Sequence, residues 1–531
     1  MGRIKRPTKR VSNTGQRGFG FTVTPRPGPS EPTPVADSRF KDDDPYSLFM
    51  GEQRLDAYLQ AAEMGWVLEL RRVLGKLDYS MLTARYSDRG RQAFHPRTVL
   101  GLICYGLFVR QKALRDLERL STLDMGAMWI CGGHRIDHST IGKFVQQHEE
   151  LLSTEFFEAV TGWVVRELKV RPGLSSIDGT VIESAGSHWR ALRAEAAREQ
   201  AEQARAAAEA APHDQDLQDA ATAATEVAAV AQERCARRHA QGKDSQTVAV
   251  VPSDLEAVIQ PRKDGAQRPG YKPSTLMHEA GVILGQHVHP SSETAAVWPL
   301  LQQHTEIFGV APPTLLMDAG YHNGPLLGEL AQREIDVLCP SGQAMGDDDW
   351  EKKGSKGLFG KSKFHFDADR DVYQCPAGEV LTYADQGKDA QGRAYRRYRT
   401  NGCAHCVLRA QCTQSRDGRS VKRYAGDEYK DAMGLVLQQP RARQVYARRM
   451  VIGEPVHAEL RERLGLRRFH RRGLTAVRGE FALYCIAFNL KKALSHRAVV
   501  VVFVVYSLPD ASSPPVALLC ALAVVDVFHD D

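Results

Sequence analysis

The sequence predicts an α/β fold: a mixed β-sheet with flanking helices, joined to an α-helical domain and interrupted by a small-stranded insertion. Short apolar segments rich in β-branched residues alternate with helical segments between residues 171 and 340, as in a sheet covered by helices. Between residues 46 and 170, apolar residues instead recur at three- and four-residue spacing, which indicates helices alone. The chain has 531 residues, far more than the ~100–200 of one ordinary domain, so two or three units are expected.

The N-terminal part divides into a basic arm and a helical domain. Residues 1–45 are rich in Pro, Gly, Ser and charge, so a flexible arm is expected there. Residues 46–170 are expected to form a compact helical domain, in which Asp137 caps a helix of the kind that a helix-turn-helix needs. An ordinary bundle of capped helices fits this segment equally well. Without any acid, the first 30 residues hold these basic side chains: Arg3, Lys5, Arg6, Lys9, Arg10, Arg17 and Arg26.

The first part of the α/β core is expected at residues 171–340, with a helical insertion at residues 190–242. The insertion is dense in Ala, Glu, Gln and Arg and is interrupted near Pro212, so it should be a solvated helical hairpin or coiled coil. Strands of the core are predicted at Leu174–Ile182, Gly281–His289, Thr314–Tyr321 and Asp336–Pro340. Helices are predicted between them at Glu293–Phe308 and Gly324–Glu334.

The remaining chain contains an insertion, a basic helical segment and an atypical tail. Residues 341–440 are Gly-rich and charged, with a cysteine cluster, so a separate insertion is expected. Residues 441–497 are helical in pattern and hold 14 Lys and Arg but four Glu, a net charge of +10 that exceeds the +6 of the whole chain. Such a segment either contacts nucleic-acid phosphates or is a solvated helix face. Residues 498–531 hold apolar runs shorter than the ~20 residues of a membrane-spanning helix, so no span is expected.

Composition indicates a folded protein of a reducing compartment. Hydrophobic residues make up 43% of the chain and charged residues 25%, which is the usual balance of soluble globular proteins. The chain has ten cysteines but no apolar run behind its basic start, which argues against secretion and a disulfide framework. A cytoplasmic location is therefore expected.

Two acids lie where a buried strand is expected to end: Asp178 before Gly179, and Asp318 before Ala319. An unpaired carboxylate in such a place is costly unless a cation or hydrogen bonds hold it. Each acid alone could cap a turn, but the two together, with Glu454 on a basic helix downstream, indicate a metal site. Carboxylates suit Mg²⁺, and two such ions about 3.5–4 Å apart stabilise the attacking and leaving oxygens of phosphodiester cleavage.

These motifs resemble those of the DDE transposases of bacterial insertion sequences, whose catalytic core has an RNase H-like fold. The resemblance implies that Asp178, Asp318 and Glu454 hold two Mg²⁺ or Mn²⁺ ions and that the protein cuts and joins DNA. It covers residues 46–494 and rests on four segments taken together: Arg89–Pro96, Ile177–Thr180, Asp318–Tyr321 and Gly453–Val456.

A signature of related transposases surrounds the third acid: Tyr, two residues, Arg, three residues, Glu, six residues, Lys. Its members here are Tyr446, Arg449, Glu454 and Arg461. Four residues rather than three separate Arg449 from Glu454, and Arg replaces Lys. The altered spacing leaves the role of Arg449 as a phosphate clamp open, and Glu459 is the fallback third acid.

The basic segment downstream is also similar to the closing segment of the family, at Leu464–Gly473 and Phe488–Lys492. The resemblance implies that its basic side chains bind phosphates near the transposon end; a surface helix without a nucleic-acid partner is the alternative. The expected DNA-binding residues are Tyr446, Arg449, Arg461, Arg467, Arg468, Arg471 and Arg472.

Four cysteines of the insertion form a possible zinc site: Cys375, Cys403, Cys406 and Cys412. Four thiolates suit tetrahedral Zn²⁺, which would stabilise a small-stranded region with little core. The set has one Cys-x-x-Cys pair and an outlying member on each side, which is not a standard ribbon spacing, so free cysteines are an equal alternative. Any zinc here would be structural.

The resemblance implies a transposase that binds the terminal inverted repeats of an insertion sequence, cleaves DNA with the help of divalent metal, and transfers a strand to target DNA. A homodimer is expected because two element ends must be brought together, in the bacterial cytoplasm at the nucleoid. The altered spacing at Glu454 and the unusual tail leave open a catalytically decayed or domesticated transposase that acts as a DNA-binding protein. A plain metal-dependent nuclease, without strand transfer, is a third possibility.

Overall fold

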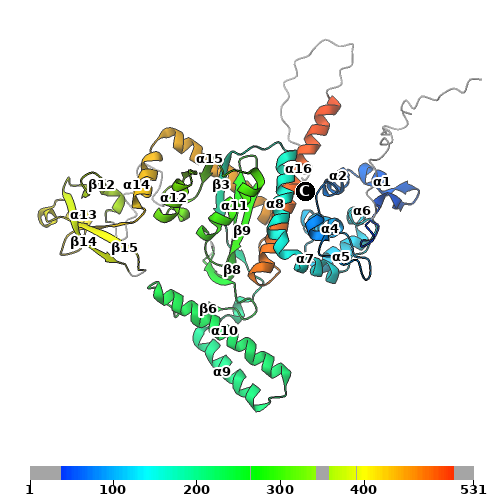
Figure 1. Ribbon diagram of the computed structural model, residues 1–531, viewed down its shortest axis with the longest axis horizontal. Helices are drawn as coiled ribbons and strands as arrows, with labels where there is room; N and C mark the ends of the chain where they lie inside the picture. The colour runs from blue at the N-terminus through cyan, green and yellow to red at the C-terminus, as the bar shows by residue number, and fades with distance from the viewer. Residues whose placement is uncertain (1–36, 263–264, 342–357, 390–391, 507–531) are drawn as a thin grey trace, which may run out of the picture.

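The computed structural model describes residues 37–262, 265–341, 358–389 and 392–506. Most of the predicted basic arm, up to residue 36, and the tail from residue 507 lie outside the described residues. The described chain is elongated, with a helical domain at one end, a mixed sheet in the middle and a small antiparallel sheet at the other end (Figure 1). The predicted α/β fold class is confirmed.

The helical domain is built from short helices whose apolar sides pack into one core. Among them, α4 is buried along most of its length because its sequence is apolar on nearly every side. Asp137 accepts a hydrogen bond of 3.0 Å from the backbone N–H of Thr140, so the predicted cap of α7 is confirmed. The helices are α1 (Leu55–Ala61), α2 (Gly65–Leu74), α3 (Ser80–Thr83), α4 (Pro96–Phe108), α5 (Leu114–Leu123), α6 (Met125–Cys131), α7 (His138–Ser153) and α8 (Glu155–Glu167).

The central sheet has the strand order β11-β10-β3-β8-β4, and β7 and β9 also pair with β8. Strands β3, β10 and β11 run parallel, whereas β8 is antiparallel to both β3 and β9. The carboxyl ends of β3, β9 and β10 therefore lie at one edge of the sheet. The strands are β3 (Leu174–Gly179), β4 (Ile182–Glu183), β7 (Val258–Pro261), β8 (Gln267–His278), β9 (Ile283–His289), β10 (Thr314–Leu316) and β11 (Asp336–Leu338).

Two features of this sheet differ from the sequence prediction. Strand β8 was not predicted, because Pro269, Gly270 and Pro273 are typical turn residues. Its pairing with strands on both sides overrides this local preference. The single strand predicted at Leu174–Ile182 is divided, since β3 ends at Gly179 and β4 begins at Ile182.

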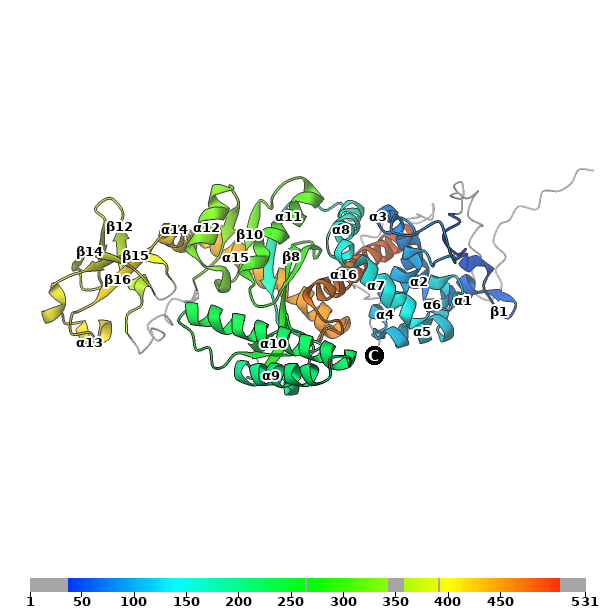
Figure 2. The same ribbon diagram turned by 60° about the horizontal axis from the view of Figure 1, so that its bottom comes forward.

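Three helices connect the sheet to its surroundings. Helix α11 (Val297–Phe308) packs on β9, and α15 (Pro440–Ala458) packs on β3 and β8. Helix α16 (Leu474–Tyr506) contacts β9 as well as α7 and α8, so it joins the sheet to the helical domain (Figure 2). One continuous apolar core therefore runs through both parts. Within the described ranges, no helix is long and apolar enough to cross a membrane.

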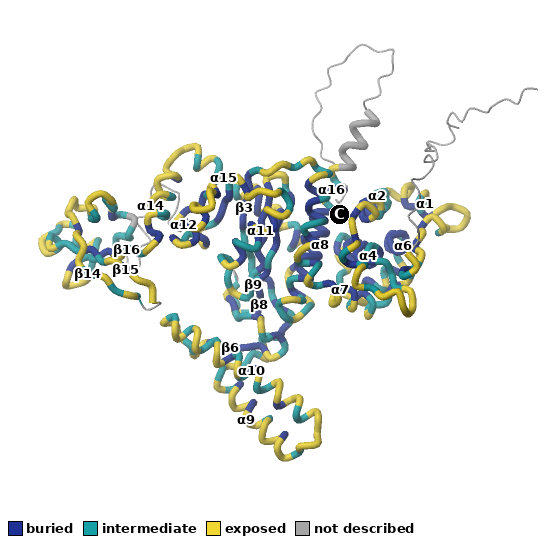
Figure 3. The backbone as a smooth tube through the Cα atoms, in the orientation of Figure 1, coloured by how far each residue is buried: buried dark blue, intermediate teal, exposed yellow. Residues whose placement is uncertain are grey.

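A helical hairpin occupies most of the insertion between β4 and β7. It consists of α9 (Ala194–Ala210) and α10 (Gln215–Ala240), and it projects away from the sheet with a largely exposed surface (Figures 1 and 3). Its own core is small and is formed by Ala197, Val227, Ala231 and Val250. Since these side chains are mostly short, the two helices can approach closely.

The second sheet, at the far end of the molecule, is antiparallel, with neighbouring strands in chain order. We call residues 358–424 the cysteine module. Its core contains five buried residues: Phe364, Tyr373, Leu381, Tyr398 and Val421. After it, α14 (Asp427–Val436) packs on α12 (Gly324–Gln332) and leads into α15. The strands are β12 (His365–Asp367), β13 (Val372–Gln374), β14 (Val380–Lys388), β15 (Ala394–Arg399) and β16 (Ser420–Tyr424).

Candidate active site

Asp178 and Asp318 lie side by side at one edge of the central sheet. Strands β3 and β10 pair in parallel with Ser176 opposite Leu316, and each aspartate follows its partner residue by two positions. Because side chains alternate along a strand with a period of two, both carboxylates leave the sheet on corresponding sides. The structure thus brings together two of the three predicted acids.

Arg449 on α15 contacts both carboxylates. Its Nη2 atom lies 3.1 Å from Oδ1 of Asp178, to which it donates a hydrogen bond, and 3.7 Å from Oδ2 of Asp318. Burial raises the pKa of Asp178; Arg449 lowers this pKa, and the negative charge of Asp318 raises it again. The edge of the sheet therefore concentrates negative charge that a cation stabilises. Two converging carboxylates are also hard oxygen donors of the kind that Mg²⁺ prefers.

His457 lies two turns after Arg449 on α15 and is also close to the acid pair. Its Nε2 atom lies 3.6 Å from Oδ2 of Asp178 and has no hydrogen-bond partner among the described residues. Burial lowers the pKa of His457 to about 4, with further lowering by Arg461 and Arg449. The imidazole is therefore neutral at pH 7 and adds no charge to the site.

Glu454 is not the residue of α15 that faces Asp178. That position belongs to Gly453, where an added Cβ would lie 3.7 Å from Oδ2 of Asp178. Glu454 follows one residue later, about 100° around the helix, and is exposed. In the part of the chain that the structure describes, no group of three or more His, Cys, Asp or Glu side chains is placed to hold a metal ion. The structure assembles an acid pair rather than a closed triad.

The fallback third acid, Glu459, is engaged elsewhere. Its carboxylate accepts a hydrogen bond of 2.8 Å from Lys491 on α16, and it lies 3.4 Å from Arg463. The π-helical turn directly after α15, Glu459–Arg463, is therefore connected to α16 by the contact between Glu459 and Lys491, which supports a structural role for Glu459.

A third acid, Glu293, which the sequence indicated only as the start of a predicted helix, lies beside the pair. An added Cβ on Gly179 would meet Cδ of Glu293 at 2.9 Å, and one on Gly320 would lie 3.8 Å from its Oε2 atom. Lys272 on β8 forms an ion pair of 3.0 Å with Glu293. The signal available in the sequence was an acid at the end of one strand, Asp178 in β3, and an acid shortly after each of two others, Glu293 after β9 and Asp318 after β10.

Buried hydroxyl groups surround the same edge. Ser274 and Tyr321 are fully buried and close to each other, and neither hydroxyl makes a well-formed hydrogen bond with another side chain or backbone group among the described residues. The Ser274 oxygen would lie 3.2 Å from a Cβ on Gly179, next to Glu293. Burial, Glu293 and the two aspartates raise the pKa of Tyr321, so its hydroxyl keeps its proton.

Apart from Arg449, the predicted DNA-binding arginines fall into three groups: two tether the chain, two lie at the surface and one is half-buried. Arg468 donates hydrogen bonds to the backbone oxygens of residues 184–186, and Arg471 forms an ion pair with Glu149, so both tether their segment to the protein. Arg467 pairs with Glu462 at the surface, and Arg472 is exposed. Arg461 is half-buried near Asp178, where burial and Arg262 lower its pKa. Tyr446, on α15, has its pKa raised by burial.

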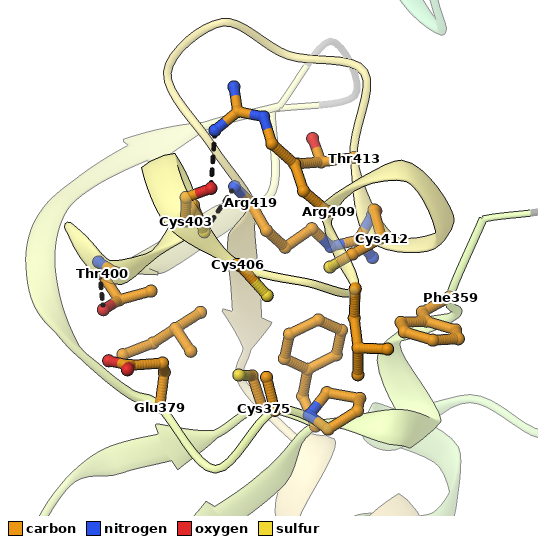
Figure 4. A pocket seen from close by; sticks show the side chains of 16 residues that line it. Phe359, Cys375, Glu379, Thr400, Cys403, Cys406, Arg409, Cys412, Thr413 and Arg419 are labelled. Carbon is orange, nitrogen blue, oxygen red and sulfur yellow. Dashed lines mark hydrogen bonds between the residues drawn. The ribbon is translucent and has the colours of Figure 1, made fainter.

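The four cysteines of the predicted zinc set line one pocket of the cysteine module. Figure 4 shows Cys375, Cys403, Cys406 and Cys412 around it, with Arg419 beside them. Burial raises the pKa of Cys412, Arg419 lowers it, and the other three thiols raise it. The four cysteines thus line one cavity, although the described residues contain no set of three side chains already placed to hold a metal ion.

Two parts of the chain match known family models. Residues 374–494 match the family described as "Transposase DDE domain", and residues 54–147 match "Transposase domain (DUF772)". The first match includes the four cysteines and α15, and the second covers most of the helical domain. No curated protein matches the chain. A solved structure, "Cryo-EM structure of piggyBac transposase synaptic complex with hairpin DNA (SNHP)", is 9% identical and covers 82% of this chain and 76% of that chain, with a TM-score of 0.28.

Proposed function

We propose that this protein is an enzyme that cleaves and joins DNA at the acid pair Asp178 and Asp318. The two family matches indicate that the chain is of the insertion-sequence DDE transposase type. The observation that carries the proposal is the contact of Arg449 with both carboxylates at the end of two parallel strands. Three segments far apart in sequence meet there. A turn-capping role for either aspartate does not require such convergence.

The two carboxylates are the residues that would hold a divalent cation. Glu454, the third acid of the family pattern, is exposed one position beyond Gly453, so a change in the rotation of α15 would be needed for it to join them. Bound Mg²⁺ or Mn²⁺ supplies stabilisation of the negative charge on the attacking and leaving oxygens. Water attacks the phosphorus of the scissile phosphodiester, and the 3′ oxygen leaves with a proton. The resulting 3′-hydroxyl then attacks a phosphodiester of target DNA and displaces its 3′ oxygen.

The substrate in this proposal is the terminal inverted repeat of an insertion sequence, followed by target DNA. Arg461, Arg467 and Arg472 are the residues of the basic segment best placed to bind phosphates, because Arg468 and Arg471 already hold the protein together. We propose a homodimer, because the two ends of the element must be brought together. The proposed location is the bacterial nucleoid.

The experiment is cleavage and joining of a labelled element end in Mg²⁺. We expect Asp178→Asn and Asp318→Asn each to abolish both reactions, and Glu454→Gln to reduce them strongly, while Glu329→Gln, an exposed change on α12, leaves them unchanged. Full activity in all three acid variants would overturn the proposed site. Cleavage without joining would indicate a plain nuclease.

A second candidate is a catalytically decayed transposase that still binds DNA. It is favoured by one observation: the residue of α15 that faces Asp178 is Gly453, which carries no ligand atom. Binding of the element end with no cleavage by the wild type in Mg²⁺ or Mn²⁺ would support this function over the first.

A further inference from the structure

Four cysteines from separate turns of the cysteine module meet at a single small cavity. Cys375 follows β13, Cys403 and Cys406 belong to the turn after β15, and Cys412 ends the short helix α13 (Arg409–Cys412). The cavity has a volume of about 20 Å³. A water-sized particle needs roughly 10–15 Å³, so the space suits one ion.

The backbone around these cysteines is shaped to bring them close. The Arg419 N–H donates a hydrogen bond to Sγ of Cys403 at 3.4 Å. Gly418 has a φ of +80°, and a Cβ there would lie 2.7 Å from Cβ of Cys403, so a larger residue would push the chains apart. A tight turn after Cys375 is closed by the N–H of Gly378, which donates to the Cys375 oxygen at 2.9 Å.

The module has little else to hold this region. Its five-residue apolar core lies within the sheet, with Cys375 and Cys412 packed at its border. Residues 400–419 contain only two four-residue helices, η8 (Gly402–His405) and α13. Domains with so small a core usually need a disulfide or a metal for stability. All nine cysteines among the described residues are free thiols, so no disulfide serves this purpose there.

We propose that Cys375, Cys403, Cys406 and Cys412 bind one Zn²⁺ ion as thiolates. Thiolate sulfur suits zinc in a tetrahedral structural site, whereas Mg²⁺ requires oxygen. Each thiol gives up its proton to solvent as its sulfur–zinc bond forms. Since the described residues contain no preformed set of three metal ligands, the side chains must close around the ion, and zinc binding is coupled to ordering of residues 400–419.

This zinc site is independent of the proposed DNA cleavage. It lies in the module beyond α14, whereas the acid pair lies at the edge of the central sheet. The module is attached to α14 by ion pairs of Lys361 with Asp427 and of Arg423 with Asp431. Zinc would therefore stabilise a module that is joined to α14 and, through it, to α15.

The test measures metal content and thiol protection on the full chain. We expect about one zinc per chain by elemental mass spectrometry in the wild type and in Cys235→Ser, a control on α10 outside the pocket. Cys403→Ser combined with Cys406→Ser should lose the zinc. In the wild type, iodoacetamide should modify the four thiols only after a chelator has removed the metal. This measurement tests the proposal even if the double variant fails to fold.

Any of three results would overturn the proposal. The first is a wild type that, after exposure to Zn²⁺ and desalting, retains no stoichiometric zinc. The second is a double variant that retains as much zinc as the wild type, and the third is modification of the four thiols that does not depend on the chelator. Loss of DNA cleavage with intact zinc binding would concern only the proposed function.

Discussion

At the scale of single residues, the pKa of Asp178 follows from the negative charge gathered where strands β3 and β10 end. The side chain of Asp178 is 24% exposed, and it lies next to the carboxylate of Asp318 and the guanidinium of Arg449. Burial and Asp318 together outweigh Arg449 in setting its pKa, which lies above the ordinary value. A raised pKa means that the folded state binds the proton more tightly than the unfolded state does.

This shift predicts how stability depends on pH. The contribution of Asp178 to folding stability is fully present at pH values below its pKa in the unfolded state. It is lost as the pH rises through its pKa in the folded state, because the folded state binds the proton more tightly than the unfolded state does. Asp178→Asn should therefore raise the free energy of unfolding at pH 7 and have little effect near pH 3. Denaturant unfolding at both pH values measures this, with the exposed Asp417→Asn as control. A variant less stable than the wild type at pH 7 would contradict the prediction.

Glu293 gives a second prediction at this scale. If its carboxylate and Lys272 shape the surroundings of the acid pair, Glu293→Gln should lower cleavage by about 10–100-fold, as loss of outer partners does at metal sites. Binding of the element end, measured by fluorescence anisotropy, should remain. Glu306→Gln, at an exposed position of α11, is the matched control. Equal rates for the two variants would remove Glu293 from the site.

At the scale of elements, the rotation of α15 decides which side chain reaches the acids. Arg449, Gly453 and His457 recur every four residues and lie toward Asp178, while Glu454 is displaced by one position. Helix α15 packs on β3 and β8, and its buried residues include Ile452 and Val456, so this packing fixes the face that is turned toward the sheet. The three-residue spacing of the family signature would place its acid at position 453.

The element-scale prediction exchanges the acid between these two positions. Gly453→Glu combined with Glu454→Ala should bind Mn²⁺ more tightly than Glu454→Ala alone, because it places a carboxylate where a Cβ lies 3.7 Å from Asp178. Electron paramagnetic resonance of free Mn²⁺ measures the affinity. Gly453→Ala, which meets only ordinary contacts, should be folded and up to about 1 kcal/mol more stable, since Ala favours helix over Gly. Equal Mn²⁺ affinity in the exchange variant and Glu454→Ala would show that Gly453 is not the decisive position.

At the scale of the whole molecule, α16 makes the helical domain and the sheet one body. Asn489 on α16 is fully buried, accepts from the Ile283 N–H at 2.9 Å, and donates to the Ile283 oxygen at 2.8 Å and to the Thr161 hydroxyl at 3.1 Å. One side chain thus bonds to β9 and α8 at once. The helical domain is therefore joined, through α8 and α16, to the same sheet that carries the acid pair.

This connection predicts a large cost for one substitution. Asn489→Leu leaves the buried polar groups of Ile283 and Thr161 without their partner, so stability should fall by about 1–3 kcal/mol. Urea unfolding measures the loss, and Ser495→Ala, whose hydroxyl bonds only within α16 at Lys491, should cost much less. A change for Asn489→Leu no larger than that for Ser495→Ala would contradict the joint role of Asn489.

Much of the fold was predictable because its signals are local. Residue pattern and spacing predict the cap at Asp137, strand β9 and the two helices α11 and α12 that follow β9 in the chain. The structure contains each of them. Strand β8 was missed because its prolines and glycine are locally unfavourable, and only pairing on both sides stabilises it.

The sequence by itself determined that Asp178 and Asp318 lie at the ends of apolar strands, because a short apolar run and the glycine that follows each acid are visible along the chain. Only the tertiary structure decided that Glu293 joins them, that Gly453 rather than Glu454 faces Asp178, and that Arg468 and Arg471 tether the chain. The physical reason is that each helical residue turns the side chain by about 100°. Which direction points at the acids depends on how α15 packs against the sheet, and that packing is set by residues far away in sequence.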